Sequence, residues 1–150
     1  MEEKKPVRHF ADFRWENTDL LAYKDEGSAP FKAITRQTLF HEPELACELR
    51  YFEVAPGGYS TLERHEHRHA VLILRGRGEC LIGDTVYPID TNDLVSVPPW
   101  TFHQVRANAD APLGFLCMVN VARDRPVLPD ERQMEELASD PRIAEFLKSE

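Results

Sequence analysis

The sequence predicts an all-β fold, an antiparallel sandwich or small barrel, with a polar arm before it and short helices after it. Between residues 31 and 121, short segments rich in β-branched and aromatic residues are separated by Gly, Pro, Asn or Asp. This is the usual alternation of strands and turns in antiparallel β-proteins. The residue pattern changes on both sides of that region. We therefore divide the chain into an N-terminal arm (1–30), a barrel (31–125) and a C-terminal helical segment (126–150).

The arm is polar and irregular, and it ends in the turn-rich residues 27–30. Within the barrel, Gly83 and Asp84 predict a hairpin turn after one of the strands. The strands that the sequence shows most clearly span residues 50–54, 70–74, 79–82, 94–97 and 113–121. We expect the first of them to end at residues 56–58, where Pro and two Gly follow one another.

Residues 70–74 are apolar at every position, so both faces of this strand are expected to be covered. One face belongs to the interior of the barrel. The other face requires a second cover, which either the N-terminal arm or a second subunit could provide.

After Arg125 the sequence becomes helical in character. Asp130 stands three residues before Gln133, which resembles a capping box. Asp140 and Pro141 place a capping residue directly before a proline at the first helical position. The apolar residues that follow recur at helical spacing. We expect two short helices that pack on the barrel and carry no chemistry of their own.

Length and charge exclude several classes of protein. A chain of 150 residues fits one domain with one core. The 18 basic and 26 acidic residues give a net charge of -8, which argues against binding to nucleic acid or to an anionic membrane. No apolar run is long enough to span a bilayer, and the N-terminus lacks the apolar core of a signal peptide. We expect a cytoplasmic homodimer that binds a small-molecule substrate.

The three cysteines, Cys47, Cys80 and Cys117, are odd in number and far apart in the sequence. This pattern is unlike that of a disulfide framework, so we expect all three to be reduced. Each lies among apolar residues, where a buried free thiol is ordinary.

Histidines carry the main functional signal. His65, His67 and His69 stand at every second position, and His103 follows further along the chain. Residues two apart in a strand share a face, and imidazole is the commonest ligand for divalent transition metals. The pattern therefore indicates a metal site. The plainer alternative is a set of solvated histidines at a strand edge.

The spacing around these histidines resembles the first motif of the cupin superfamily, which reads Gly, five residues, His-x-His, three or four residues, Glu, six residues, Gly. Here Gly57, Glu63, His65, His69 and Gly76 occupy its positions without a gap. Two identities are exchanged, because Glu63 stands at the first histidine and His69 at the glutamate.

The second cupin motif reads Gly, five residues, Pro, any residue, Gly, two residues, His, three residues, Asn. Pro98 and His103 match it, while Asn92 and Trp100 replace the two glycines and Asn108 lies one position beyond the final Asn. The resemblance covers roughly residues 45–121. It implies that the barrel is a small cupin (jelly-roll) barrel.

The resemblance also implies a set of metal ligands, namely Glu63, His65, His69 and His103. Three imidazoles and one carboxylate would leave open positions on Mn, Fe, Ni, Co or Zn. If the hairpin between the first two ligand strands is shorter than the ungapped count, His65 and His67 form the His-x-His pair and Glu63 moves outward.

Three further residues are candidates for catalysis. Gln104 flanks His103, Tyr59 flanks the first motif, and Cys117 lies on a predicted strand whose inward face the sequence does not fix. Residues 62–71 are similar to those of small cupins that act on sugar-phosphate-derived substrates such as methylthioxylulose phosphate. That similarity makes Cys117 a candidate sulfur-handling nucleophile.

The resemblance favours a metal-dependent enzyme that acts on a small oxygenated metabolite. A Lewis-acid cation that stabilises an enolate would serve isomerase or lyase chemistry. An iron-dependent dioxygenase is the first alternative, because it would use the same open positions for substrate and oxygen. The second alternative is a non-catalytic cupin that binds a small molecule.

Overall fold

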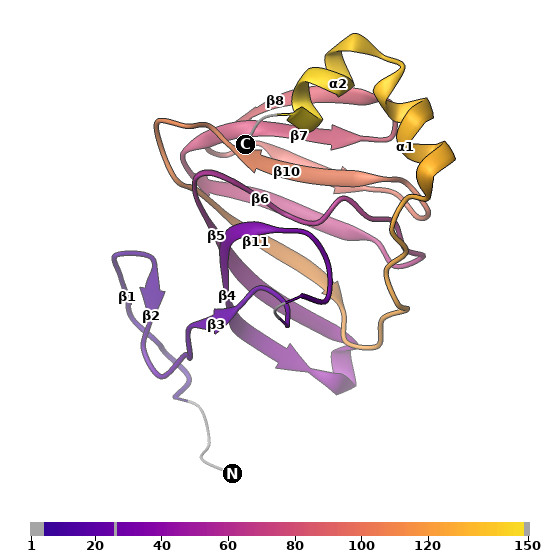
Figure 1. The fold of residues 1–150 in the computed structure, drawn as a ribbon. Helices are drawn as coiled ribbons and strands as arrows, with labels where there is room; N and C mark the ends of the chain where they lie inside the picture. Colours follow the sequence, from indigo (N-terminus) through magenta and orange to yellow (C-terminus); the bar gives the residue numbers. More distant parts are fainter. Residues whose placement is uncertain (1–4, 26, 149–150) are drawn as a thin grey trace.

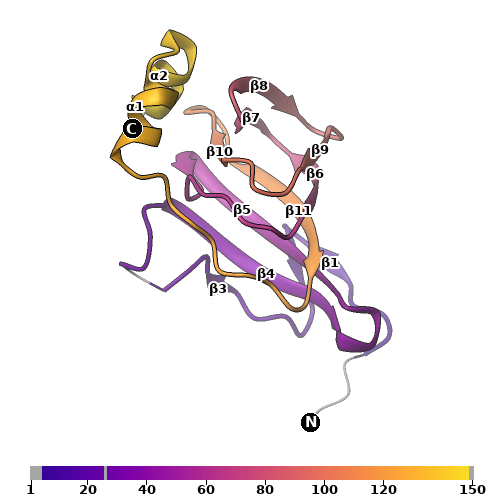
Figure 2. The same cartoon turned by 90° about the vertical axis from the view of Figure 1, so that its right-hand side faces the viewer.

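A computed structural model describes residues 5–25 and 27–148 of the chain. Most of this region forms one antiparallel sheet, which curls into a half-open barrel with two helices at one end (Figures 1 and 2). The hydrogen-bonded strands follow the order β8-β7-β10-β5-β11-β6-β9. Strand β4 lies outside this sequence of neighbours and pairs with β5 as well. The predicted all-β jelly-roll barrel is confirmed. Its strands are β4 (Lys32–Glu42), β5 (Cys47–Tyr59), β6 (His69–Arg75), β7 (Arg77–Ile82), β8 (Thr85–Asp90), β9 (Leu94–Val97), β10 (His103–Ala107) and β11 (Leu113–Asn120), with a 3-10 turn, Pro43–Leu45, between β4 and β5.

Strand β5 joins the two halves of the barrel. Its first part pairs with β4 and β11, and its last residue, Tyr59, pairs with Arg106 of β10. The strand therefore continues through residues 56–58, where the sequence predicted its end. Gly58 permits the close approach of β4, because a Cβ atom there would lie 2.6 Å from the carbonyl oxygen of Lys32.

The N-terminal arm contains short strands. β1 (Phe10–Ala11) and β2 (Arg14–Trp15) form a hairpin, and β3 (Leu21–Ala22) pairs with β4. The rings of Phe13 and Trp15 lie 6.0 Å and 5.1 Å from that of Tyr51, on the outer face of β5. The arm thus covers the outer face of β5 around Tyr51. The cover that the sequence predicted concerns residues 70–74, and there Leu72 remains 38% exposed.

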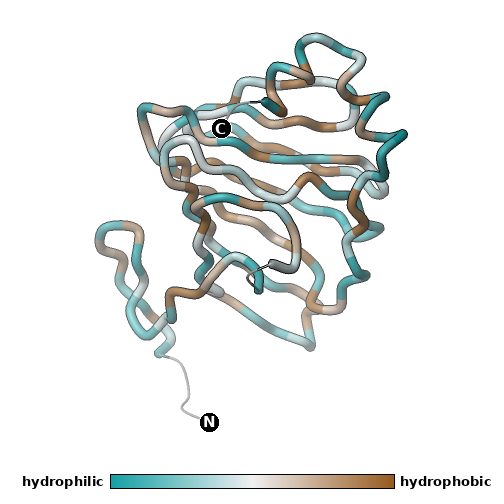
Figure 3. Tube along the Cα trace, in the orientation of Figure 1, coloured by the Kyte–Doolittle hydropathy of each residue, from teal (hydrophilic) through white to brown (hydrophobic). Residues whose placement is uncertain are grey.

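The core lies between the two walls of the barrel. Along the strands, hydrophobic and hydrophilic residues alternate (Figure 3), because successive side chains point to opposite faces. Phe52 of β5, Phe115 of β11 and Ile73 of β6 face inward and are almost completely buried. The three cysteines are free, as expected.

Helices α1 (Glu131–Ala138) and α2 (Pro141–Lys148) pack at the end of the barrel near β7 and β8 (Figure 1). The capping box is confirmed: Asp130 accepts a hydrogen bond from the backbone of Gln133 at 2.8 Å, and the Gln133 side chain accepts one from the backbone of Asp130 at 3.0 Å. Ile143 and Phe146 of α2 are buried in a second small core. None of the helices in the described ranges has the length and apolarity needed to cross a membrane.

Candidate metal centre

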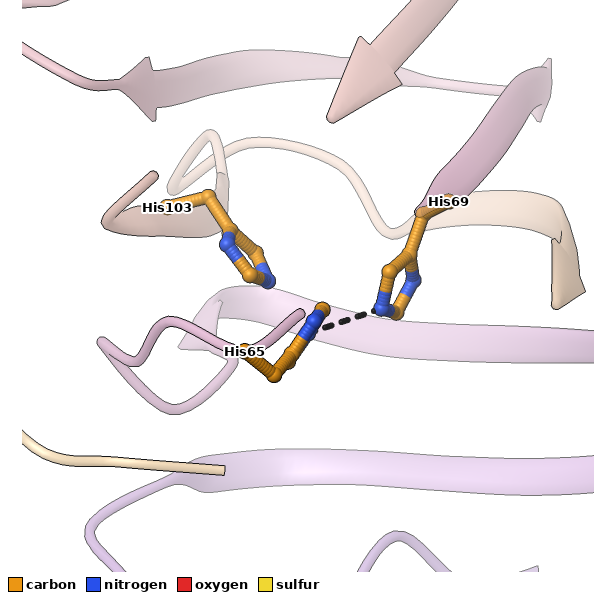
Figure 4. A group of neighbouring side chains, drawn as sticks. All are labelled: His65, His69 and His103. Atoms are coloured by element: carbon orange, nitrogen blue, oxygen red, sulfur yellow. Dashed lines mark hydrogen bonds between the residues drawn. The ribbon is translucent and has the colours of Figure 1, made fainter. Parts of the chain in front are cut away.

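Three imidazoles converge inside the barrel from three places in the chain. His65 follows β5, His69 is the first residue of β6, and His103 is the first residue of β10 (Figure 4). One ring nitrogen from each lies within 4.8 Å of the others, and the Nε2 atoms of His65 and His69 are 2.9 Å apart. His65 is 1% exposed and His103 is 9% exposed, so the cluster is largely shielded from water.

Backbone contacts hold these histidines in place. Glu63 and His103 exchange two backbone hydrogen bonds, at 3.0 Å and 3.3 Å, which bring the segment after β5 beside the start of β10. The chain then turns tightly before His69, and the carboxylate of Asp124 accepts the backbone N–H groups of Glu66 and His67 at 2.7 Å and 3.0 Å. The turn therefore depends on a residue from the loop after β11.

The Nδ1 atoms of two histidines are used for orientation. Nδ1 of His65 lies 2.8 Å from the carbonyl oxygen of His67, and Nδ1 of His103 lies 2.9 Å from that of Thr101. A carbonyl oxygen can only accept, so each Nδ1 carries the proton and donates it. This leaves the lone pair on Nε2, the atom that can bind a metal.

Burial keeps the three imidazoles neutral. It is the largest cause that lowers the pKa of His65 to about 4, and it lowers the pKa of His69 and His103 as well. Neighbouring imidazoles lower these pKa values further. Neutral imidazole is the form that coordinates metals, so the cluster is ready to bind one at neutral pH.

The spacing of the nitrogens also fits a metal. Two imidazole nitrogens that bind one cation at right angles, each at about 2.1 Å, lie roughly 3 Å apart. The 2.9 Å between Nε2 of His65 and Nε2 of His69 agrees with this value. The donor set therefore suits a divalent transition metal.

Glu63 lies close to the cluster, but its carboxylate is engaged elsewhere. The residue is 6% exposed, and its side chain forms an ion pair with Lys24 of the arm at 2.6 Å. The group of ligand atoms that all lie within 4.8 Å of one another consists of ring nitrogens of His65, His69 and His103, and the Glu63 carboxylate is not part of it. Glu63 as a fourth ligand stays a prediction.

His67 takes a position different from that of its neighbours. Its ring stacks on the ring of His65 with centroids 3.6 Å apart, and its Nδ1 lies 2.7 Å from a carboxylate oxygen of Asp124. With His65 and Asp124 it forms a second group of possible ligands, which shares His65 with the first group. Asp124 belongs to no motif and lies far from the histidines in the sequence, so sequence reasoning missed it.

A cavity of about 610 Å³ surrounds the cluster. The three convergent imidazoles, His67 and Cys117 line it, together with four basic side chains, Lys24, Arg36, Arg50 and Arg123. Tyr59 and Gln104 are absent from the part of the lining that the structure describes. The ring of Tyr59 packs under the guanidinium of Arg106 at 4.3 Å, and Gln104 donates to the carbonyl oxygen of Ser60 at 2.7 Å. The catalytic role predicted for these two residues gains no support from their position.

Cys117 faces the cavity, the orientation that the sequence left open. It is 1% exposed, and its Sγ lies 3.0 Å from Nδ1 of His69 and 3.6 Å from a guanidinium nitrogen of Arg50. Burial raises the pKa of the Cys117 thiol, while the charge of Arg50 lowers it. The thiol is thus in contact with both a candidate metal ligand and a cation.

Comparisons with known proteins agree with this geometry. The family model described as "Cupin domain" matches residues 50–119. The chain is 54% identical to the 1-methylthio-D-xylulose 5-phosphate methylsulfurylase of Rhodospirillum rubrum. The similarity extends over 146 residues, which are 97% of this chain and 94% of that protein.

Two solved structures are similar over nearly the whole chain. A cupin 2 conserved barrel domain protein from Rhodopseudomonas palustris is 54% identical, with a TM-score of 0.87 over 93% of this chain and 97% of that one. A cupin-2 domain protein from Rhodospirillum rubrum is 53% identical, with a TM-score of 0.86 over 97% of this chain and 98% of that one. Jelly-roll topology, histidines at the positions of both motifs and these similarities together show that the chain belongs to the cupin superfamily.

Proposed function

We propose that the protein is a metal-dependent enzyme that removes the methylthio group of 1-methylthio-D-xylulose 5-phosphate. One observation carries the proposal: the Cys117 sulfur lies inside the cavity, 3.0 Å from His69 of the candidate metal centre. Removal of a sulfur substituent next to a ketone requires a thiol nucleophile and a group that stabilises negative charge. Cys117 and the candidate metal centre would supply these two functions, and they lie next to each other. The name of the 54% identical relative supports this choice of substrate.

The proposed step is attack by the Cys117 thiolate on the sulfur atom of the substrate. A new S–S bond forms, and the bond between that sulfur and C1 of the sugar breaks. The electron pair stays on C1, delocalises onto the neighbouring carbonyl and takes up one proton, which balances the proton lost by the thiol. The sugar leaves as the 1-deoxy ketose phosphate, reduced at C1, while the cysteine is oxidised to a methyl disulfide. A second, low-molecular-weight thiol then reduces this disulfide by thiol exchange.

His65, His69 and His103 would hold the metal, which on donor type is Mn, Fe, Ni, Co or Zn. When bound, the cation would supply Lewis-acid stabilisation of the charge that develops on the carbonyl oxygen. The role of His69 follows from its two nitrogens. With Nε2 used for coordination, Nδ1 carries the proton and can donate it to Cys117. This hydrogen bond and the charge of Arg50 both favour the thiolate.

Replacement of Cys117 by Ser in the metal-loaded protein tests the proposal. Serine preserves the shape of the site but supplies no sulfur nucleophile, so release of the 1-deoxy product is expected to fall at least about 1,000-fold with unchanged metal content. The matched control is Cys47→Ser, at a cysteine outside this cavity, which is expected to keep full activity. Product formation is followed by NMR in the presence of a small thiol.

The outcome that would contradict the proposal is a Cys117→Ser variant that turns the substrate over at the normal rate. The same assay without oxygen separates the dioxygenase alternative, since thiol-dependent removal of the methylthio group needs no O2. Turnover that stops without oxygen would favour the dioxygenase.

We also propose that the chain forms a homodimer in the cytoplasm. The free cysteines suit a reducing compartment. Leu72, Leu94 and Met118 support the dimer, because they remain exposed on the outer face of the sheet although their neighbours in the strands point into the core.

A further inference from the structure

Three arginine side chains reach the cavity from different elements. Arg36 lies on β4, Arg50 on β5, and Arg123 in the loop after β11. All three line the cavity that holds the histidine cluster. The register confirms the inward direction of Arg36, because it pairs across the strands with the core residue Phe52.

The charges around Arg36 do not cancel. The side chains whose charges act on it are Arg50, Arg123 and one carboxylate, Glu48. That carboxylate already forms an ion pair with Arg123 and lies 3.4 Å from Nδ1 of His41. Three guanidinium groups thus share one carboxylate, so these four side chains together carry two more positive charges than negative ones. The other carboxylates that line the cavity are those of Asp25, Glu63, which pairs with Lys24, and Asp124, which binds the turn before β6.

The arginines also have unused hydrogen-bond donors. The Nε atoms of Arg36 and Arg50 are buried without a hydrogen-bond partner. Within the described ranges, the side chain of Arg36 forms neither a hydrogen bond nor an ion pair, although its backbone pairs in the sheet. The side chain of Arg36 is half-buried, and this burial lowers the pKa of its guanidinium. The cluster therefore has donors available for an anion that enters the cavity.

We propose that Arg36, Arg50 and Arg123 form the subsite for the phosphate group of the substrate. A phosphate monoester carries close to two negative charges at neutral pH, which matches the excess charge of the cluster. The guanidinium fork offers paired donors that suit phosphate oxygens. Identification of the anion as the phosphate of a sugar rests on the proposed function.

The position of Arg50 links this subsite to the chemistry. Its guanidinium lies 3.6 Å from the Cys117 sulfur, and Cys117 contacts His69. A phosphate bound by the cluster therefore anchors the substrate next to the proposed nucleophile. The cavity volume of about 610 Å³ lies within the range usual for small-molecule sites.

The test uses the metal-loaded protein and the variant Arg36→Met, which keeps an unbranched apolar stem and removes the charged guanidinium. Inorganic phosphate is the first probe, with binding measured by calorimetry. Loss of a charge-assisted hydrogen-bonding group is expected to weaken phosphate binding roughly 10- to 100-fold. The matched control is Arg132→Met, at an arginine of α1 that is 86% exposed in its side chain and outside the cavity, and it is expected to bind phosphate normally.

The second probe is turnover. Arg36→Met is expected to raise KM for 1-methylthio-D-xylulose 5-phosphate by the same factor, with a smaller effect on kcat. For the sugar without its phosphate, the variant and the wild type are expected to have equal kcat/KM. A general disturbance of the site would lower activity on both sugars. If Arg36→Met does not fold, Arg123→Gln takes its place, because removal of that cation leaves Glu48 free to neutralise Arg36.

Two results would overturn the subsite: equal phosphate affinity in wild type and variant, or an unchanged KM for the sugar phosphate. The first would mean that phosphate binds elsewhere, for example on the metal. The subsite and the proposed function fail in different ways. Phosphate binding that depends on Arg36, without turnover of the methylthio sugar, contradicts the function and keeps the subsite.

Discussion

His67 and His69 stand two residues apart, yet they meet different surroundings. His69 begins β6 and points into the cavity, where its Nε2 faces that of His65. His67 lies in the turn before that strand and bonds to Asp124 instead. The rule that alternate residues share a face holds within a strand, and the turn between residues 65 and 69 breaks it.

Metal retention in two alanine variants distinguishes the two roles. His69→Ala removes one of the three convergent nitrogens, so the purified variant is expected to lose nearly all of its metal on dialysis. His67→Ala leaves the three nitrogens in place and is expected to keep its metal, with affinity reduced about 10-fold at most through the lost support of the turn. Elemental analysis of the dialysed proteins gives the metal content.

Thermal unfolding of both variants serves as the control for folding in that experiment. A folded His69→Ala protein with full metal content, next to a His67→Ala protein without metal, would show that His65 and His67 form the ligand pair. The alternative reading of the hairpin would then be correct.

The sequence revealed the histidines of the site but not the residues that support them. The spacing of the cupin motifs is local, so the resemblance pointed to His65, His69 and His103 from two short stretches of sequence. Lys24, Arg36 and Asp124 belong to the arm, to β4 and to a loop, and no spacing relates them to the histidines. Their place in the site follows only from tertiary structure.

At the scale of elements, the sequence predicted strands and helices from regular local patterns. It did not predict where a strand exchanges one neighbouring strand for another. The expected bounds of the strand 94–97 are those of β9, and the capping box correctly marked the start of α1. The predicted end of β5 at residues 56–58 was wrong. Pro and Gly commonly end a strand, but here they lie where β5 passes from its pairing with β11 to its pairing with β10.

The arm shows a similar limit. Its polar composition predicted no strand, yet β3 adds to the edge of β4 through residues 21 and 22. Two residues carry too little periodicity for a sequence-based prediction. The strand matters for function, since it leads directly to Lys24, the partner of Glu63.

Helix α2 is expected to stabilise the barrel without a part in the chemistry. Phe146 is 2% exposed and packs in the second core with Leu62 and Leu81. Phe146→Ala should therefore lower the free energy of unfolding by about 3–5 kcal/mol, the usual cost of emptying a buried aromatic site. Denaturant unfolding measures this change, and metal content is expected to remain normal.

The matched comparison is Met134→Ala on α1, at a side chain that is 36% exposed and should cost much less, about 1 kcal/mol or below. Equal destabilisation by the two variants would show that Phe146 does not anchor the helix. Loss of metal from a folded Phe146→Ala protein would show that the helices also support the metal centre.

At the scale of the whole molecule, the two faces of one sheet have separate uses. On β6 and β11, Val71 and Cys117 point into the cavity. Their neighbours Leu72 and Met118 therefore point outward, and Leu72 pairs across the sheet with Leu94. The arm covers only the neighbouring part of this face, around Tyr51. An apolar area of this kind on a small protein is typical of a surface that binds another molecule.

A second copy of the chain is the partner that we expect on this face, so Leu72→Glu and Met118→Glu should each shift the protein from dimer to monomer. A carboxylate buried in an apolar interface without a counter-charge is strongly unfavourable. Sedimentation velocity measures the change. Met134→Glu on α1 is the control, because this side chain is 36% exposed on a helix that packs against α2, and it should leave the dimer intact. A wild-type protein that sediments as a monomer, or glutamate variants that still dimerise, would contradict the assignment of this face.

Metal content and thiol-dependent turnover in a monomeric variant would further show whether each barrel carries a complete site. We expect a complete site, because the three convergent histidines all belong to one chain.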